Sequence, residues 1–171
     1  MRFPMTLSAA VKVTTALAVL ALAVGLPIQA RALTALPAAA SGLVAGVLLV
    51  TVLGLGVVAL QAPRAVRLEA TRLVVERRGW SDVKVPYFAV TGVERGPALE
   101  LLGGAVRRVA GNGGLLGFTG LFHVRDVGLV RCWATRLGRP TVLVRRGKDR
   151  PLLLGVDEPE RLFEELRRRA G

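Results

Sequence analysis

The chain has 171 residues, of which 52% are hydrophobic, and carries 24 Lys and Arg against 12 Asp and Glu, a formal net charge of +12. Its apolar content excludes a disordered polar chain, and its single cysteine excludes a disulfide scaffold. Residues 1–63 contain three bases and no acid, whereas residues 64–171 hold the other 21 bases and all 12 acids. We therefore expect an apolar part followed by a basic part.

Two apolar segments in the first part predict a transmembrane helical hairpin over 1–63. They cover about 11–29 and 38–60, and Lys12 is the only charged residue in either. Crossing a bilayer takes about 20 apolar residues, and the 108 residues that follow are too few to bury both helices on all sides. We expect the second domain to occupy 64–171.

Basic residues that flank the two segments predict the orientation of the hairpin, because cytoplasmic flanks are enriched in Lys and Arg. One side carries Arg2, Lys12, Arg64, Arg67 and Arg72, and the other carries Arg31 alone. We expect a two-span protein of the inner (cell) membrane, with both termini in the cytoplasm.

A cleaved signal peptide is the competing interpretation of the first segment, because Ala30-Arg31-Ala32 loosely resembles a cleavage site. The arginine at that site and the length of the apolar stretch disfavour cleavage. The second segment would anchor the chain in either case.

Small residues recur four apart as Ala21-x-x-x-Gly25 and Gly42-x-x-x-Gly46. Such spacing lets helix backbones approach closely. It predicts a homodimer face, or else it reflects packing of the two helices within one hairpin or merely the abundance of Ala and Gly. We favour the last two interpretations over a homodimer face.

Alternating apolar and polar residues predict short strands directly after Pro63, separated by Gly, Pro and Asp. The expected strands lie near 66–70, 73–77, 83–85, 90–94, 99–102, 121–127, 129–135, 141–146 and 151–155. The glycine-rich stretch 103–120 is interpreted as a long connection between strands and not as an anion-binding loop around Arg107 and Arg108. Regularly spaced short strands predict a small sandwich or barrel.

The end of the chain predicts an amphipathic helix. Asp157-Glu158-Pro159-Glu160 resembles a capped helix start. Leu162, Phe163 and Leu166 then form one apolar stripe. We expect this helix to cover an open end of the sheet.

The basic part resembles the bacterial pleckstrin homology (PH-like) domain family over 64–169. The resemblance lies in Leu73-Val74-Val75-x-Arg77-x-Gly79-Trp80, Val85-Pro86-Tyr87-Phe88-Ala89-Val90-x-x-Val93, Gly117-Phe118-x-Gly120-Leu121-Phe122, Trp133-Ala134-Thr135 and Leu152-Leu153-Leu154 leading to Asp157-Glu158-Pro159-Glu160-Arg161-Leu162-Phe163. It implies about seven antiparallel strands capped by a C-terminal α-helix, and it implies no catalysis.

The residue inventory also argues against an enzyme. A single histidine, His123, and a single cysteine, Cys132, cannot make a His/Cys zinc site. No serine lies in G-x-S-x-G and no Walker A loop is present. We therefore expect no catalytic residue, no cofactor and no metal.

Basic clusters indicate partners instead. Each Lys or Arg near an anionic leaflet contributes about 1 kcal/mol, and the residues expected to contact anionic lipid are Arg64, Arg67, Arg72, Arg77, Arg78 and Lys84. Nucleic acid is disfavoured, because no aromatic residues are interleaved with these bases. We expect a binding or scaffold domain for protein partners, a homo-oligomer or anionic lipid headgroups; the alternative is an accessory subunit of a membrane enzyme or transporter.

Overall fold

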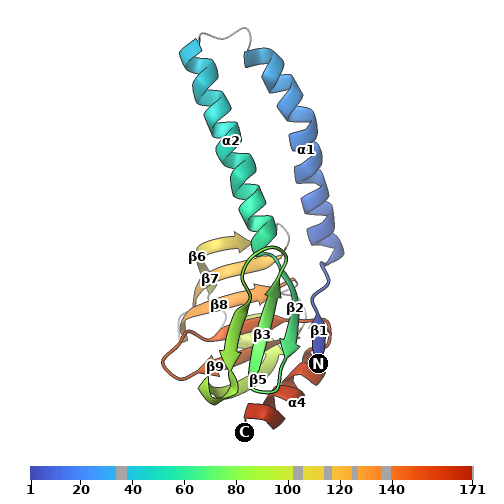
Figure 1. The fold of residues 1–171 in the computed structure, drawn as a ribbon, viewed down its shortest axis with the longest axis vertical. Coiled ribbons are helices and arrows are strands. Elements are labelled where there is room, and N and C mark those ends of the chain that lie inside the picture. Colours follow the sequence, from blue (N-terminus) through green and yellow to red (C-terminus); the bar gives the residue numbers. More distant parts are fainter. Residues whose placement is uncertain (34–37, 102–105, 114–116, 125–126, 136–139, 171) are drawn as a thin grey trace.

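A computed structural model describes residues 1–171 apart from 34–37, 102–105, 114–116, 125–126, 136–139 and 171. Two long helices rise from one end of a mainly-β domain, and both chain termini lie toward the other end (Figure 1). The arrangement confirms the predicted order of elements, which is an apolar helical pair followed by a mainly-β domain with a C-terminal helix.

The two helices are α1 (Ala9–Leu33) and α2 (Ala38–Gln61). Both are long and apolar enough to cross a membrane, over Val11–Ile28 and Ala40–Gln61. Only 6% of the first stretch and none of the second is buried within the structure. A core helix of a soluble protein would be mostly buried, whereas these two helices leave most of their apolar surface exposed within the described chain.

Two sheets form the domain. The first has the strand order β1-β2-β3-β4, with β1 (Arg2–Pro4), β2 (Pro63–Leu68), β3 (Arg72–Arg77) and β4 (Val83–Pro86). A 3₁₀ turn, η1 (Tyr87–Ala89), leads to the second sheet. That sheet has the order β5-β9-β10-β8-β7-β6, with β5 (Val90–Pro97), β6 (Val106–Gly113), β7 (Phe118–Val124), β8 (Gly128–Ala134), β9 (Pro140–Arg146) and β10 (Leu152–Gly155).

The strand pairing differs in detail from the expectation of about seven antiparallel strands. Nine described strands follow residue 63, and β10 pairs with β8 in parallel while all the other described pairs are antiparallel. The parallel pair arises because β10 follows β9 in the chain but lies between β9 and β8 in the sheet.

The alternation of side chains explains where the core lies. Leu73 and Val75 on β3 face Val142 and Val144 on β9, and all four are completely buried. Helix α4 (Pro159–Ala170) closes this core with its buried leucines, Leu162 and Leu166. A second, smaller apolar cluster covers the opposite face of the second sheet and includes Val130, Cys132, Leu143 and Leu153.

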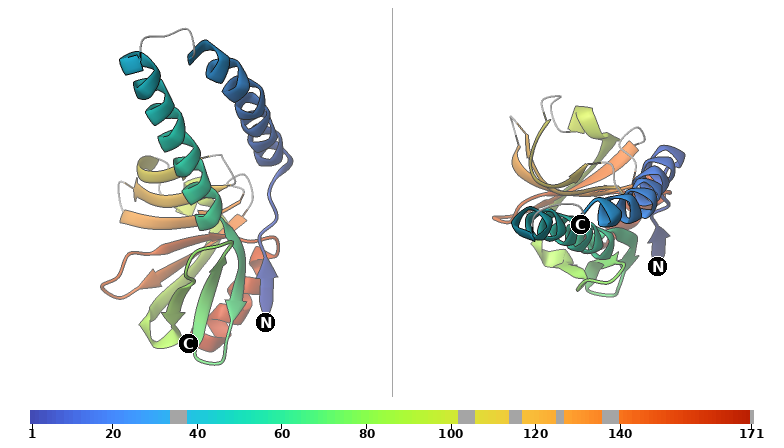
Figure 2. Two further views of the ribbon diagram at one scale, coloured as in Figure 1. Left: turned by 45° about the horizontal axis from the view of Figure 1, so that its top comes forward. Right: turned by 90° about the horizontal axis from the view of Figure 1, so that it is seen from above.

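An unpredicted strand, β1, precedes the hairpin and belongs to the domain that follows it. It runs beside β2 with Phe3 opposite Val66 (Figure 2). Phe3 is 1% exposed and Met5 is 4% exposed, both within the main core. The backbone N–H of Asp157 donates to the Pro4 carbonyl at 3.1 Å, so the segment also touches the start of α4. The chain therefore leaves the domain, makes the hairpin and returns.

Two expectations about the middle of the domain were wrong. The strand expected over 99–102 is instead a short helix, α3 (Ala98–Leu101), with Leu102 outside the described residues. The connection expected over 103–120 contains β6, which pairs with β7. Gly111 and Gly120 are cross-strand partners with φ of 120° and 133°, and a Cβ on either would lie 2.2 Å from a carbonyl oxygen of the other strand. The glycines permit this close crossing.

Phe3→Ala should destabilise the PH-like domain by about 3 kcal/mol, because it empties a fully buried aromatic position. Thermal or denaturant unfolding of the full chain in detergent, followed by near-ultraviolet circular dichroism, measures the loss. Arg2→Gln is the neighbouring control, since the Arg2 side chain is half exposed and a surface ion pair contributes little. Equal stability of Phe3→Ala and the unchanged chain would contradict the role of β1 in the core.

Candidate functional site

The junction between α2 and the domain contains no free linker. Only Ala62 separates α2 from β2. The turn between β3 and β4 packs against this junction: the N–H of Arg78 donates to the Ala62 carbonyl at 3.1 Å and the N–H of Gly79 to the Leu60 carbonyl at 3.0 Å. A Cβ at Gly79 would lie 2.3 Å from the Leu60 Cδ2 atom, so the small residue suits the contact. These hydrogen bonds fix the position of the domain relative to the C-terminal end of α2.

An aromatic side chain and several bases surround this junction. Trp80 follows Gly79 and is 47% exposed. Arg64 and Arg78, two of the expected lipid-contact residues, are exposed and form no ion pair with any other residue that the structure describes, so their charge is available to an external anion. Lys84, a third expected contact, is also exposed, but it lies on β4 opposite Val74 and its charge helps to lower the pKa of Glu69.

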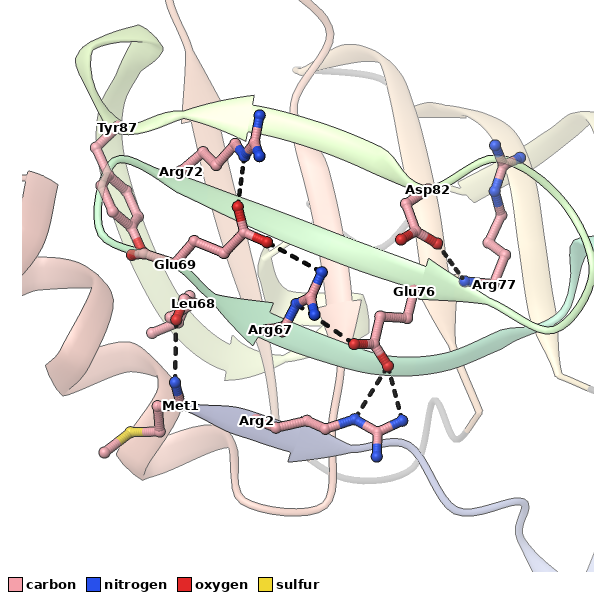
Figure 3. Close-up of polar contacts among 10 residues, drawn as sticks. All are labelled: Met1, Arg2, Arg67, Leu68, Glu69, Arg72, Glu76, Arg77, Asp82 and Tyr87. Atoms are coloured by element: carbon pink, nitrogen blue, oxygen red, sulfur yellow. Dashed lines mark hydrogen bonds and ion pairs between the residues drawn. The ribbon is translucent and has the colours of Figure 1, made fainter.

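Two further expected lipid contacts, Arg67 and Arg72, are engaged by acids on the outer face of the first sheet (Figure 3). Arg67 lies 3.0 Å from Glu69 and 3.5 Å from Glu76, and Arg72 lies 2.5 Å from Glu69. The hydrogen bond from Arg72 lowers the pKa of Glu69, so this acid stays ionised. These two arginines carry a compensated charge.

The sixth expected lipid contact, Arg77, points inward from β3. It shares the core-facing side of the strand with Leu73 and Val75. Its guanidinium carbon lies 5.4 Å from the centre of the Trp133 ring, a cation–π arrangement. Its terminal nitrogen bonds the Ser81 hydroxyl at 3.2 Å, and burial lowers its pKa. Sequence periodicity could have revealed this orientation, since Arg77 continues the buried positions of β3.

A second basic surface lies on β6 and β7, which the sequence had assigned to a connection. Arg107, Arg108, Val109 and His123 line an open cavity of about 460 Å³. Arg107 is the cross-strand partner of His123, and a bulge follows Arg108. Val109, at that bulge, is 58% exposed. The glycine-rich stretch thus presents its arginines from a strand and not from a loop.

The predicted helix-packing residues lie in open space. A Cβ built at Gly25, Gly42 or Gly46 meets no atom within 4 Å, and Ala21 is exposed on α1. There is open space beside these glycines in the described chain. Their part in helix packing, within the hairpin or in a homodimer, remains a prediction.

The described residues include no group of three or more His, Cys, Asp or Glu side chains that could hold a metal ion. His123 is exposed on β7. Cys132 is buried in the second apolar cluster, and burial raises the pKa of its thiol to about 12. A thiol with this pKa stays protonated at neutral pH and is a poor nucleophile.

The strand order and the helix that closes the core define a PH-like domain. Residues 64–170 match the family described as Bacterial PH domain, and the chain belongs to this family. No curated protein and no solved structure matches the chain. PH domains are generally non-catalytic binding modules. The family match begins after the hairpin, so β1 lies outside it although it completes the first sheet.

Cys132 should resist alkylation by a maleimide at pH 8 in the folded chain, because the thiol is buried and remains protonated below a pKa of about 12. One equivalent should react after denaturation, as measured by mass spectrometry. A Cys132→Ser chain carrying Ser81→Cys is the matched control, since position 81 is exposed and should react within minutes. Fast labelling of the native thiol would show that the second cluster opens readily.

Proposed function

We propose that the chain is a two-span protein of the inner membrane whose PH-like domain lies on the cytoplasmic surface as a binding or scaffold module without catalysis. Anionic lipid headgroups and a protein are the partners that this arrangement favours. The α2 junction supports the proposal, because it holds a basic, Trp-bearing face directly at the end of an apolar helix.

The pairing of β1 with β2 is the observation that carries the arrangement. If both helices cross a bilayer, their domain-proximal ends lie on one side, since β1 before α1 and β2 after α2 share one sheet. Lys12 near the start of α1 and Arg64 after α2 lie on that side, whereas Arg31 lies at the far end. This distribution favours the cytoplasm for the domain. It also argues against cleavage, because removing residues 1–30 would remove Phe3 and Met5 from the core.

A second candidate function is that of an accessory subunit in a membrane enzyme or transporter complex. The open faces at Gly25, Gly42 and Gly46 favour it, because small residues leave room for a helix of another chain. Crosslinking in the native membrane followed by mass spectrometry separates the candidates. One stoichiometric foreign partner supports the subunit, and products containing only this chain support a homo-oligomeric scaffold.

A fluorescent protein that folds only in the cytoplasm should be fluorescent when fused to either end of the chain. A phosphatase active only outside the cytoplasm should be inactive at both ends and active when inserted within 34–37, which serves as the positive control. The reason is the excess of basic residues on the domain side. Phosphatase activity at Gly171, or loss of an N-terminal tag from the mature chain, would overturn the proposed topology.

Trp80 should be quenched more strongly by brominated phosphatidylglycerol than by brominated phosphatidylcholine in proteoliposomes of the full chain. Trp favours the bilayer interface, and each neighbouring base contributes about 1 kcal/mol toward an anionic lipid. The signal is the fluorescence of the unchanged chain minus that of the Trp80→Phe variant. This subtraction removes the contribution of Trp133, which both chains contain.

The double variant Arg64→Gln, Arg78→Gln should lose this preference. The double variant Arg95→Gln, Arg161→Gln should keep it, because these arginines pair with Glu160 and Glu158 and leave the junction unchanged. Equal quenching by the two lipids would count against anionic-lipid contact at the junction.

A further inference from the structure

Three arginines occupy core-facing positions where the main core ends. Arg77 continues the buried side of β3 after Val75, and Arg146 continues the buried side of β9 after Val144. Arg131 shares a face of β8 with Trp133, two residues away. The strand register places Leu152 opposite both Arg131 and Val144, so the β8 and β9 positions flank β10 on one face. We call Arg77, Arg131 and Arg146 the arginine cluster.

The members of the cluster lie within electrostatic reach of one another. Burial lowers the pKa of Arg77 and of Arg146, and the positive charge of Arg131 lowers each further, while Asp149 beside Arg146 and Asp82 beside Arg77 act in the opposite direction. Like charges that face one another in a partly buried place are unfavourable unless an anion lies among them. Side chains of this kind are therefore expected to hold a counter-ion.

The described acids compensate this charge only in part. Asp149 forms an ion pair with Arg146 at 3.7 Å. Asp82 accepts a hydrogen bond from the backbone N–H of Arg77 at 3.3 Å, and its charge raises the pKa of the Arg77 side chain. No ion pair involves Arg131 among the residues that the structure describes. The cluster keeps an excess of positive charge.

Two buried donors beside the cluster also have no acceptor. The Nε atom of Arg77 and the Nε1 atom of Trp133 are buried, and neither has a hydrogen-bond partner within the described part of the chain. Trp133 is only 4% exposed, and the Arg77 guanidinium lies over its ring. Buried N–H groups without an acceptor cost free energy. An anion that received both bonds would remove this cost.

We propose that Arg77, Arg131 and Trp133 form a binding site for a phosphate group, with Arg146 at its border. Arginine forks and N–H donors match the oxygens of phosphate. Arg131 is exposed, so the cluster reaches the surface at this residue. Arg77 is opposite Pro63, the first residue of β2, so the site lies beside the end of α2. This inference deepens the proposed function and rests on it only for the source of the phosphate, which is a lipid headgroup or free phosphate.

Calorimetric titration of the full chain in an uncharged detergent tests the site. The two probes are inorganic phosphate, against chloride at equal ionic strength, and dihexanoyl phosphatidylglycerol below its micellar concentration. We expect saturable binding of at least one probe. Binding of the lipid alone identifies a headgroup site, and binding of inorganic phosphate identifies a site open to free phosphate. Absence of binding by both probes would overturn the proposal.

Arg131→Gln should weaken binding by about tenfold or more, because it removes a charge-assisted hydrogen bond from an exposed position. Trp133→Phe keeps the ring and removes the N–H, and it should weaken binding severalfold. Arg167→Gln is the matched control, since Arg167 is exposed on α4, which lies toward the other end of the domain (Figure 1).

Equal weakening by Arg131→Gln and Arg167→Gln would indicate diffuse attraction to a basic protein and would overturn the site. Unfolding curves of each variant verify the fold. Because detergent titration involves no bilayer, its failure leaves the topology assays untouched, and failure of the topology assays leaves the phosphate site intact.

Discussion

The pairing of β1 with β2 is the contact on which the rest of the structure depends. It joins residues on either side of a hairpin, so the chain closes a loop of about sixty residues through two apolar helices. Closing such a loop costs entropy that grows slowly with length, and the burial of Phe3 and Met5 offsets it. The pairing also covers an edge of β2 that would otherwise offer unpaired backbone groups. The domain and the hairpin are thus one structural unit.

Both ends of the helical pair are attached to the domain. Strand β1 leads to α1 through a short segment in which the Thr6 hydroxyl bonds Asp157 at 2.8 Å, close to the start of α4. Helix α2 meets β2 directly and is bonded to the β3–β4 turn. If the two helices cross a bilayer, a domain held at both helix ends keeps one face toward it. Charge on that face would then act at a fixed distance from the headgroups, within the range where screening is weak.

The sequence predicted the parts of the fold that have strong periodicity. The two apolar helices, the strands with buried alternation such as β3 and β9, and the amphipathic α4 are confirmed. Strand β1 escaped prediction because three residues carry no readable period and its partner lies sixty residues away. Strand β6 escaped because it is exposed and rich in glycine, and glycine there serves a close strand crossing that sequence cannot reveal. For the expected lipid-contact site, the sequence could name the basic residues but not the acids that pair with some of them. Ion pairs such as that of Arg72 with Glu69 depend on the folded geometry.

The acids of the domain explain why its net positive charge is not spread evenly. Glu69 and Glu76 form ion pairs with arginines on the outer face of the first sheet. Glu94 pairs with Arg145, and Glu165 pairs with Arg168 near the end of α4. The side chains of the inward-facing Arg77 and the neighbouring Arg131 form no ion pair with an acid in the described structure. A guanidinium that only filled space could be replaced by an apolar side chain at lower desolvation cost. These arginines lie beside the unpaired Trp133 N–H and near the C-terminal end of α2. An external anion explains their position better than packing does.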